Sequence, residues 1–392
     1  IFLNYLRIDK MKLKAISSSV LLALLPVSGV YAAAMDRSGQ SISAFLQPNN
    51  YFEAGISVLD PSVSGKSRFG NISDMGDDYY FPTAALKLQP TEKFSFGLLY
   101  DQPFGADASY SDGRVEATGA PLAGTNVEVN SQNLTVLVGF QPNENINIYG
   151  GGAYQEVKGD LALTSLQYTA TFKKDSGTGW IAGAAFQIPD IALKASLTYR
   201  SEIDHELETV EGGAAVASIP GASKDTKLTT PQSVNLDFQT GIMANTVAFA
   251  NVRWVEWSSL DIDVSKFRTF TRLHPQLSLL NGGQGANIIE YSKDQWSANV
   301  GVGRKFNDQW AGNFSVGWDS GAGNPVTALG PTEGYWNVGL GAQFSPTPAT
   351  FIAGGVKYFM LGDADAQTAK VPVGKFEDND ALAYGLKIGY KF

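Results

Sequence analysis

The last stretch of the chain alternates between apolar positions and small or cationic positions. One set is apolar throughout and carries aromatic side chains near its ends: Leu382, Tyr384, Leu386, Ile388, Tyr390 and Phe392. The intervening set is Ala383, Gly385, Lys387, Gly389 and Lys391. Because successive strand side chains point to opposite faces, this period of two predicts a strand with one apolar face. An edge strand of a soluble sheet and a strand of a membrane barrel both fit, so the rest of the chain must decide.

The same alternation recurs at 193–200, 310–319 and 336–344. The apolar sets of these three stretches are Leu193, Ala195, Leu197 and Tyr199; Trp310, Phe314, Val316 and Trp318; and Trp336, Val338, Leu340, Ala342 and Phe344. The positions between them are small or polar, including Arg200, Ser315 and Asp319. This pattern favours an apolar face toward lipid and a polar face toward a lumen.

Short turns and long connections alternate along the chain. Short polar or proline-containing turns are expected at 88–93, 140–145, 186–190, 243–246, 306–309 and 344–348. Longer connections are expected at 65–79, 104–125, 158–167, 205–226, 260–290, 320–333 and 363–376. Outer-membrane barrels have this plan, with short periplasmic turns and long external loops. We therefore predict an all-β fold, a transmembrane antiparallel β-barrel of about 14 strands over residues 51–392, with both termini in the periplasm.

The first residues indicate export. A basic start at 11–14, an apolar stretch from Val20 to Leu25 and small residues near Ala32 predict a signal peptide over 11–32, cut after Ala32 or Ala34. Residues 1–10 precede the natural-looking start methionine, and we interpret them as mis-annotated upstream sequence. No apolar run after this region approaches the length of a membrane helix, so a membrane-embedded form would have to be a barrel.

Composition and charge exclude several classes of function. The chain has 42 glycines, no cysteine and a formal charge of -9. Such an acidic chain repels phosphate backbones, so no nucleic-acid partner is expected. Disulfides and thiolate chemistry are unavailable, and neither a metal nor a cofactor is expected.

Enzymatic chemistry has little support in the sequence. There are two histidines, His205 and His274, and no Gly-x-Ser-x-Gly nucleophile motif. Asp204-His205-Glu206 would be half of a metal or acid-base site, but its place at the edge of a strand favours a solvated rim residue. A barrel enzyme acting on lipids through a serine and a histidine stays open as the enzymatic alternative.

A candidate binding surface lies in the longest loop. Phe267, Phe270, Leu273, Leu277 and Leu280 recur at spacings of three and four, which places them on one face of a helix. The cations Arg268 and Arg272 lie among them. This face would collect an acyl chain while the cations attract its carboxylate, or it would pack against neighbouring loops, with Pro275 breaking the helix. The sequence leaves both functions open.

Three inward-facing cations are candidates for contact with a substrate carboxylate: Arg200, Arg253 and Lys357. The competing interpretation is structural, because barrels fill their lumens with paired charges, and Glu202 would be a partner for Arg200.

Taken in order, Tyr51-Phe-Glu-Ala-Gly55, Asp60-Pro-Ser-Val-Ser-Gly65, Leu197-Thr-Tyr-Arg-Ser-Glu202 and Trp254-Val-Glu-Trp-Ser258 make the chain resemble the FadL family. These are outer-membrane transporters for long-chain fatty acids and other hydrophobic compounds. The resemblance runs from about Ser38 to Phe392. It implies a monomeric barrel, an N-terminal hatch in the lumen, and passage of substrate through a lateral opening in the wall.

The hatch departs from the family pattern. Relatives commonly carry a longer hatch with Asn-Pro-Ala ahead of the first strand, whereas here residues 33–50 form a short segment ending in Leu46-Gln-Pro-Asn-Asn50. We expect Phe45 and Leu46 to belong to this hatch. Whether so short a segment closes the lumen is left open by the sequence.

The function expected from this resemblance is passive transport of hydrophobic small molecules, foremost long-chain fatty acids, across the outer membrane of a Gram-negative bacterium. The expected partners are the substrate, outer-membrane lipid or detergent and the barrel insertion machinery. A general diffusion porin for small hydrophilic solutes is the alternative, but a porin would have polar loops rather than loops rich in Phe and Leu.

Overall fold

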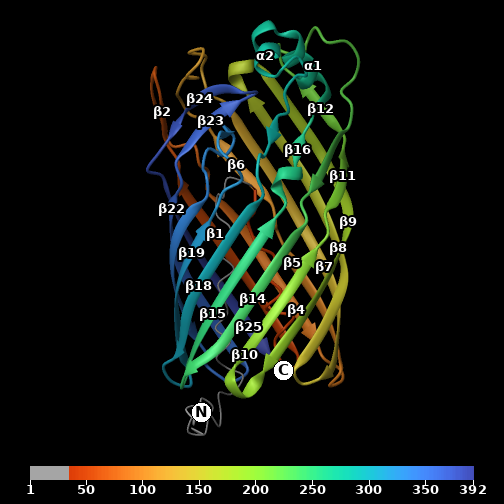
Figure 1. Cartoon of the computed structure of the whole chain (residues 1–392), viewed down its shortest axis with the longest axis vertical. Helices are drawn as coiled ribbons and strands as arrows, with labels where there is room; N and C mark the ends of the chain where they lie inside the picture. The colour runs from red at the N-terminus through yellow and green to blue at the C-terminus, as the bar shows by residue number, and fades with distance from the viewer. Residues whose placement is uncertain (1–34) are drawn as a thin grey trace, which may run out of the picture.

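The computed structural model describes residues 35–392, so the expected signal peptide and upstream residues lie outside the described part. Within it, fourteen antiparallel strands form a closed ring, in which β9 pairs with β10 to complete the circle. Figure 1 shows the barrel with its long axis vertical. The prediction of a 14-stranded antiparallel barrel is confirmed. None of the described helices is long and apolar enough to cross a membrane.

Fourteen strands make up the wall. In chain order they are β1 (Tyr51–Ser62), β4 (Tyr79–Leu88), β5 (Phe94–Asp101), β7 (Asn126–Asn143), β8 (Ile146–Leu163), β9 (Tyr168–Ile188), β10 (Leu193–Arg200), β14 (Ser233–Met243), β15 (Thr246–Val255), β18 (Gln295–Lys305), β19 (Trp310–Asp319), β21 (Tyr335–Phe344), β22 (Thr350–Leu361) and β25 (Asp380–Lys391).

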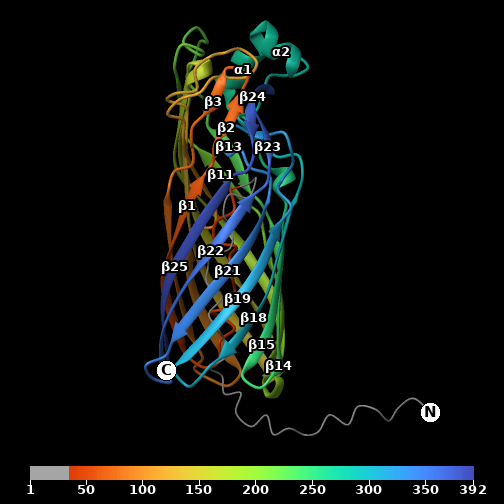
Figure 2. The same cartoon turned by 90° about the vertical axis from the view of Figure 1, so that its left-hand side faces the viewer.

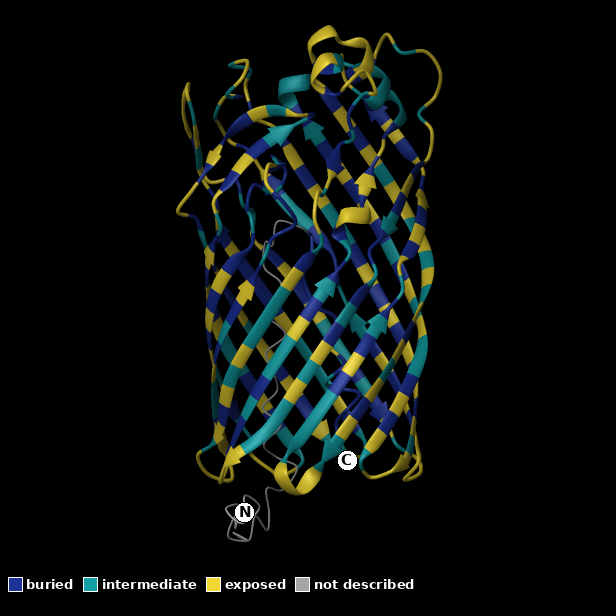
Figure 3. Ribbon diagram, viewed as in Figure 1, coloured by how far each residue is buried: buried dark blue, intermediate teal, exposed yellow. Residues whose placement is uncertain are grey.

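The alternation seen in the sequence is the alternation of the two faces of the wall. On β25 the lipid-side residues Leu386 and Ile388 are 53% and 49% exposed, whereas Ala383 is fully buried. Figure 3 shows exposed and buried residues following one another along the strands. Outward-facing aromatic residues, among them Trp296, Trp318 and Trp336, are exposed near the outer ends of their strands. They mark the outer membrane interface, as aromatic girdles do in such barrels.

The six predicted short turns all join wall strands at one end of the barrel, where the C-terminus also lies (Figure 2). The connection predicted at 158–167 is shorter than expected: residues 158–163 belong to β8, and a single 3-10 turn, Thr164–Leu166, leads to β9. The alternation continues there because Leu161 and Leu163 face inward onto other apolar side chains beyond the membrane.

The external end carries smaller elements. Outside the ring lie β2 (Gly65–Ser67), β3 (Gly70–Ile72), β6 (Gly105–Ser109), β11 (Ile203–Leu207), β12 (Thr209–Gly212), β13 (Thr226–Thr230), β16 (Asp261–Ile262), β17 (Ile289–Glu290), β20 (Val326–Thr327), β23 (Ala364–Thr368) and β24 (Val371–Phe376). Two helices, α1 (Ser265–Leu273) and α2 (Pro275–Leu280), stand at the outermost edge (Figures 1 and 2). Short 3-10 turns cover Pro189–Ile191 and Trp257–Ser259.

Candidate functional site

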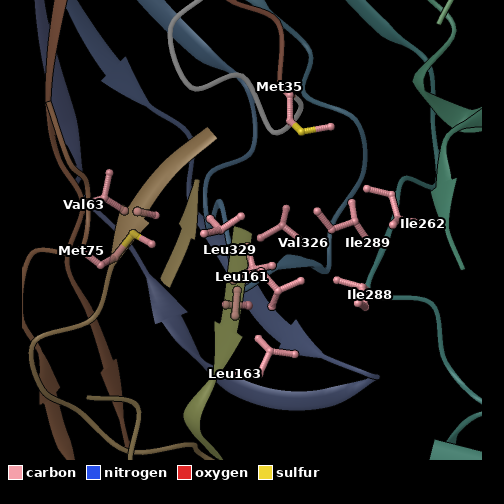
Figure 4. Close-up of a cluster of buried hydrophobic side chains, with 14 of the residues drawn as sticks. Met35, Val63, Met75, Leu161, Leu163, Ile262, Ile288, Ile289, Val326 and Leu329 are labelled. Atoms are coloured by element: carbon pink, nitrogen blue, oxygen red, sulfur yellow. The ribbon is translucent and has the colours of Figure 1, made fainter. Parts of the chain in front are cut away.

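The external half of the lumen is filled with apolar side chains. One continuous cluster gathers buried residues from β7, β8, β9, β13 and the external loops. Figure 4 shows Met35 at one side of it, with Leu161, Ile288, Ile289 and Val326 below. Burial of such side chains is favourable by about 25 cal/mol per Å² of apolar surface, so this cluster holds the loops together above the membrane.

An apolar cavity of about 500 Å³, part of it open to solvent, lies within this cluster. Its aliphatic lining consists of Met35, Val127, Val129, Val157, Leu161, Leu207, Leu228, Ile262, Ile288 and Ile289. Gly159, Phe172 and Thr226 complete the lining, together with Lys158 and Asp160, whose side chains are exposed. A cavity of this composition suits a hydrocarbon body and offers little to a hydrophilic solute.

The wall is interrupted between its second and third strands. The β4–β5 ladder ends at Ala84 and Tyr100, although β4 itself continues outward as far as Tyr79 on its β1 side. Pro82 on β4 and Pro103 after β5 lack the backbone N–H that a ladder requires, which accounts for the break. Strand β6 then resumes pairing with β7 at Gly105.

Three residues of the N-terminal segment occupy this break. Asp36 forms a β-bridge with Phe104. The Arg37 amide donates to the Pro103 carbonyl at 2.7 Å, and the Gly105 amide donates to the Met35 carbonyl at 2.9 Å. The Arg37 guanidinium lies 3.8 Å from the ring centroid of Tyr79, on the other side of the break. Residues 35–37 therefore lie between the break and the apolar cavity, which Met35 also lines.

Two of the predicted lumen cations hold this segment in place. Arg253 pairs with Asp36 at 2.6 Å and also donates to Gln40 at 3.1 Å and to Asn235 at 2.7 Å. Arg200 donates to the Gln40 carbonyl at 2.7 Å. The suggested pair between Arg200 and Glu202 does not form, since the Glu202 side chain is exposed. The structure gives both arginines protein partners.

Lys357, the third predicted lumen cation, lies apart from the other two. It is 8% exposed, and no ion pair or hydrogen bond joins it to another described residue. It lines a polar space in the lumen together with Asn337 and Gly339. A Cβ on Gly339 would lie 3.0 Å from the Lys357 chain, so this glycine makes room for it.

The loop residues predicted to form one apolar surface are divided between two environments. Phe267 is fully buried against Tyr168, with 4.8 Å between ring centroids, and Leu277 is also buried. Phe270 packs partly against the same cluster. Leu273 and Leu280 are 68% and 49% exposed, because the chain breaks between α1 and α2 at His274.

One exposed apolar residue of the two helices was not among those predicted from the spacing of three and four. Leu279 is 83% exposed and lies in α2 beside Leu280. Arg272 is exposed in the last turn of α1, whereas Arg268 pairs with Asp263. The exposed surface formed by Leu273, Leu279 and Leu280 is called the leucine edge below.

The carboxylate of Glu211 joins the start of α1 to the rest of the external region. The sequence did not predict this role. The Glu211 carboxylate accepts hydrogen bonds from the backbone amides of Lys266 and Phe267 at 3.0 and 2.8 Å, and from the Tyr168 hydroxyl at 3.0 Å. Val264, the N-cap of α1, has no side chain able to do this. A carboxylate at a helix N-terminus is stabilising, but the partner is 55 positions away and leaves no local signal.

His205 is buried, so the expectation of a solvated rim residue was wrong. Its strand β11 folds inward against β9, where a Cβ on Gly177 would lie within 3.1 Å of the imidazole. The imidazole lies 3.1 Å from the Gln155 side chain and 3.4 Å from Asp175. Burial lowers the pKa of His205, and the nearby Asp175 opposes this shift. Among residues 35–392 no cluster of potential ligands is able to hold a metal ion.

The predicted hatch residues Phe45 and Leu46 are buried on the periplasmic side of the segment. Phe45 packs edge-on against Tyr149 of β8, with ring centroids 5.7 Å apart. Lys194 donates to the Leu46 carbonyl at 2.6 Å, and Lys87 donates to the Gln47 carbonyl. The described segment 35–50 thus lies inside the lumen and contacts the wall through residues 35–37, Gln40 and residues 45–47.

Comparisons with known proteins agree on one architecture. A family model for outer membrane protein transport proteins (OMPP1/FadL/TodX) matches residues 32–392. Comparison with curated protein sequences gives no significant match.

Solved structures with the same fold share little sequence with this chain. A FadL homologue from Pseudomonas aeruginosa aligns with a TM-score of 0.68 and 16% identity, covering 89% of this chain and 92% of its own. The Pseudomonas putida toluene transporter TodX gives 0.62 and 11%, covering 89% and 91%. The monoaromatic hydrocarbon channel CymD gives 0.56 and 12%, covering 94% and 97%.

Proposed function

Because the chain belongs to the OMPP1/FadL/TodX family of outer membrane transport proteins, we propose that it takes up long-chain fatty acids and related hydrocarbons through the apolar cavity and the break in its wall. It is a transporter of hydrophobic molecules in the outer membrane of a Gram-negative bacterium, not an enzyme. The observation that carries the proposal is the position of Met35–Arg37 between an aliphatic cavity and an interruption of the wall.

Capture begins at the leucine edge. A hydrophobic molecule has to leave water at the cell surface, and each methylene that becomes buried contributes about 0.8 kcal/mol. Leu273, Leu279 and Leu280 offer exposed apolar surface at the outermost part of the protein. A contact covering only a few methylenes is weak enough to release the molecule inward.

From the leucine edge the hydrophobic molecule enters the apolar cavity, and it leaves the barrel through the break in the wall. Below the cavity the lumen becomes polar, so an apolar molecule that moved down the barrel axis would lose its favourable surroundings. The lateral path through the break leads to the lipid instead, once residues 35–37 move aside. Those residues are held by a few backbone hydrogen bonds, one ion pair and one cation–π contact, so a local displacement is sufficient.

The finer choice of substrate follows from the shapes and charges along this path. Aliphatic lining and leucine side chains fit an alkyl chain, and exposed Arg272 would meet the carboxylate of a fatty acid at the entrance. Lys158, the only cation in the cavity lining, is exposed, so the carboxylate of a fatty acid gains little electrostatic stabilisation inside the cavity. We therefore expect neutral alkanes to compete with fatty acids for uptake.

The test is to fill the cavity. Val157 on β8 is buried and lines the cavity, and Val157→Phe should reduce uptake of labelled oleate several-fold in a host without its own fatty-acid transporter. Val136→Phe is the matched control, because Val136 lies on the neighbouring strand β7 with 54% exposure on the lipid side. Heat-modifiable electrophoretic mobility shows that both variants have folded. Equal uptake by the two folded variants would contradict transport through this cavity.

A further inference from the structure

The N-terminal segment covers only one side of the lumen. Its apolar residues pack against β4, β5, β7, β8 and β9, in a cluster that includes Ile42, Phe45, Leu46, Ala85, Leu99, Leu137, Tyr149, Ile181 and Ala185. Two glycines make this contact possible. A Cβ on Gly97 would lie 2.4 Å from the ring of Phe45, and one on Gly139 would lie 2.9 Å from it.

The opposite side of the lumen is polar and is not filled by the segment. There β18, β19 and β21 present a layer of short polar side chains: Gln295, Ser297, Asn299, Asn313, Ser315 and Asn337. Between this layer and the segment lies a space of about 1490 Å³, which includes volume open to solvent. This space is called the polar chamber below.

Side-chain exposure separates the two sides of the lumen. Ser297, Asn299 and Asn313 face the polar chamber and are half-buried. Ser95 faces inward from β5 on the side covered by Phe45 and is fully buried. Within the chamber layer Gln295, Ser315 and Asn337 are buried, whereas Ser297, Asn299 and Asn313 are partly exposed, unlike Ser95.

Several polar atoms in the chamber wall require water. The side-chain oxygens of Gln295, Asn299 and Asn337 are buried without a hydrogen-bond partner among the described residues. Leaving such groups unpaired is unfavourable, whereas a water molecule with two to four polar partners satisfies them. A dense layer of amides and hydroxyls offers such partners.

The chamber continues toward the periplasmic end of the barrel. A second space shares five lining residues with it: Ser43, Glu53, Asp237, Phe249 and Lys387. That space also reaches Gln239 and Val247, close to the short turn between β14 and β15. Toward the outside, the buried pair of Arg253 and Asp36 lies at the boundary of the chamber.

We propose that the polar chamber is an aqueous compartment, open to the periplasm, that admits small hydrophilic solutes beside the N-terminal segment. This activity is separate from the route of hydrophobic molecules, because it uses the other half of the lumen. The chamber carries both signs of charge, with Glu53 paired to Lys387 at 3.0 Å and with Asp237 and Lys357 in its lining. Small anions and small cations should therefore both enter.

The absence of cysteine from the chain makes a direct test possible. Ser297→Cys places a thiol in the chamber, and Ser95→Cys places one on the covered side. Each folded barrel is treated with a small anionic and a small cationic methanethiosulfonate reagent, and the modification rate is followed by mass spectrometry. The thiol at 297 should react with both reagents at least tenfold faster than the thiol at 95. Equal protection of both thiols would overturn the proposal.

The direction of entry has its own test. Gln239→Trp, added to Ser297→Cys, places a large ring at the periplasmic mouth and should slow modification several-fold. Leu236→Trp on the same strand is the control, because Leu236 is 47% exposed on the lipid side. If the Gln239→Trp protein reacts as fast as the control, the chamber does not open toward the periplasm and the proposal fails.

Discussion

The guanidinium of Arg253 on β15 donates to the carboxylate of Asp36 at 2.6 Å, with the two side chains 4% and 5% exposed. This pair joins the wall of the barrel to the part of the N-terminal segment that occupies the wall break. Gly39 donates to the same carboxylate, and Asn235 connects Arg253 to the Gly39 carbonyl. The outer part of the segment is therefore joined to the wall by one buried network of charge.

Removing one member of this pair should release the outer part of the segment. Asp36→Ala leaves the Arg253 charge buried and unpaired, a loss of about 3 to 5 kcal/mol for docking of the segment. Hydrogen exchange at Arg37, Gly39 and Gln40 should become faster while the barrel strands stay protected. Asp308→Ala is the control, because the Asp308 side chain is 99% exposed in its pair with Lys305. Unchanged exchange in the Asp36 variant would mean that backbone hydrogen bonds alone hold the segment.

Locking the segment in the break should stop transport. Hydrogen bonds from Arg37 to Pro103 and from Gly105 to Met35 lie on either side of the bridge between Asp36 and Phe104. Asp36 and Phe104 are therefore a non-hydrogen-bonded antiparallel pair, whose Cα atoms lie about 4.5 Å apart. Such a spacing is suitable for a disulfide. The double variant Asp36→Cys with Phe104→Cys should lose uptake when oxidised and regain it after reduction. Uptake that does not depend on the redox state would place the exit elsewhere.

Substitutions of the exposed leucine edge and of the buried Phe267 should have different effects. Changing the leucine edge at Leu273, Leu279 and Leu280 to serine removes exposed apolar surface, so uptake at low substrate concentration should fall several-fold while the loop fold is kept. Phe267→Ser creates a buried cavity and should instead loosen α1, at a cost of about 3 to 5 kcal/mol. Limited proteolysis of intact cells distinguishes the outcomes. A protease-sensitive leucine-edge variant would show that these leucines also hold the helices.

Acidification should loosen the antiparallel pair of β11 and β13. Burial lowers the pKa of His205, so at a pH below the ordinary histidine value the opened strand pair binds a proton that the closed one excludes. Stability of the closed form therefore falls as the pH decreases and is unaffected above that value. Hydrogen exchange in β11 at pH 5 and pH 8 measures the difference, and His205→Gln should reduce it. Equal exchange at the two pH values in the unaltered protein would argue against a buried neutral imidazole.

The barrel could be predicted from sequence because lipid imposes a period of two on every wall strand. The lipid side of the strand starting at Trp310 follows the predicted set, with Trp310 and Phe314 exposed and Ser315 buried. In the external half of the barrel, lipid does not impose this period. Leu161 continues a strand where a loop was expected, since a local apolar core replaces lipid as the reason for alternation.

Site residues were harder to predict because their partners are distant in sequence. Arg200 was assigned the neighbouring Glu202, but its partner is the Gln40 carbonyl, a backbone group that composition does not reveal. The spacing of Phe267 and Leu273 indicated one helical face, yet it carried no information about which residues the cluster would cover. Glu211 lies in the short strand β12 with no motif around it, and only the fold brings it to the start of α1.

The length of β8 determines how far the external end of the barrel rises above the outer membrane. Its 18 residues span about 60 Å along the strand. A tilt of about 40° leaves roughly 45 Å along the barrel axis, while the apolar band of an outer-membrane barrel is about 25 Å tall. The outer end of β8 therefore stands about 20 Å above the hydrocarbon, and α2 lies at the outermost edge of the protein (Figure 1). An insoluble molecule approaching the cell therefore meets the exposed leucines of α2 before it reaches the membrane.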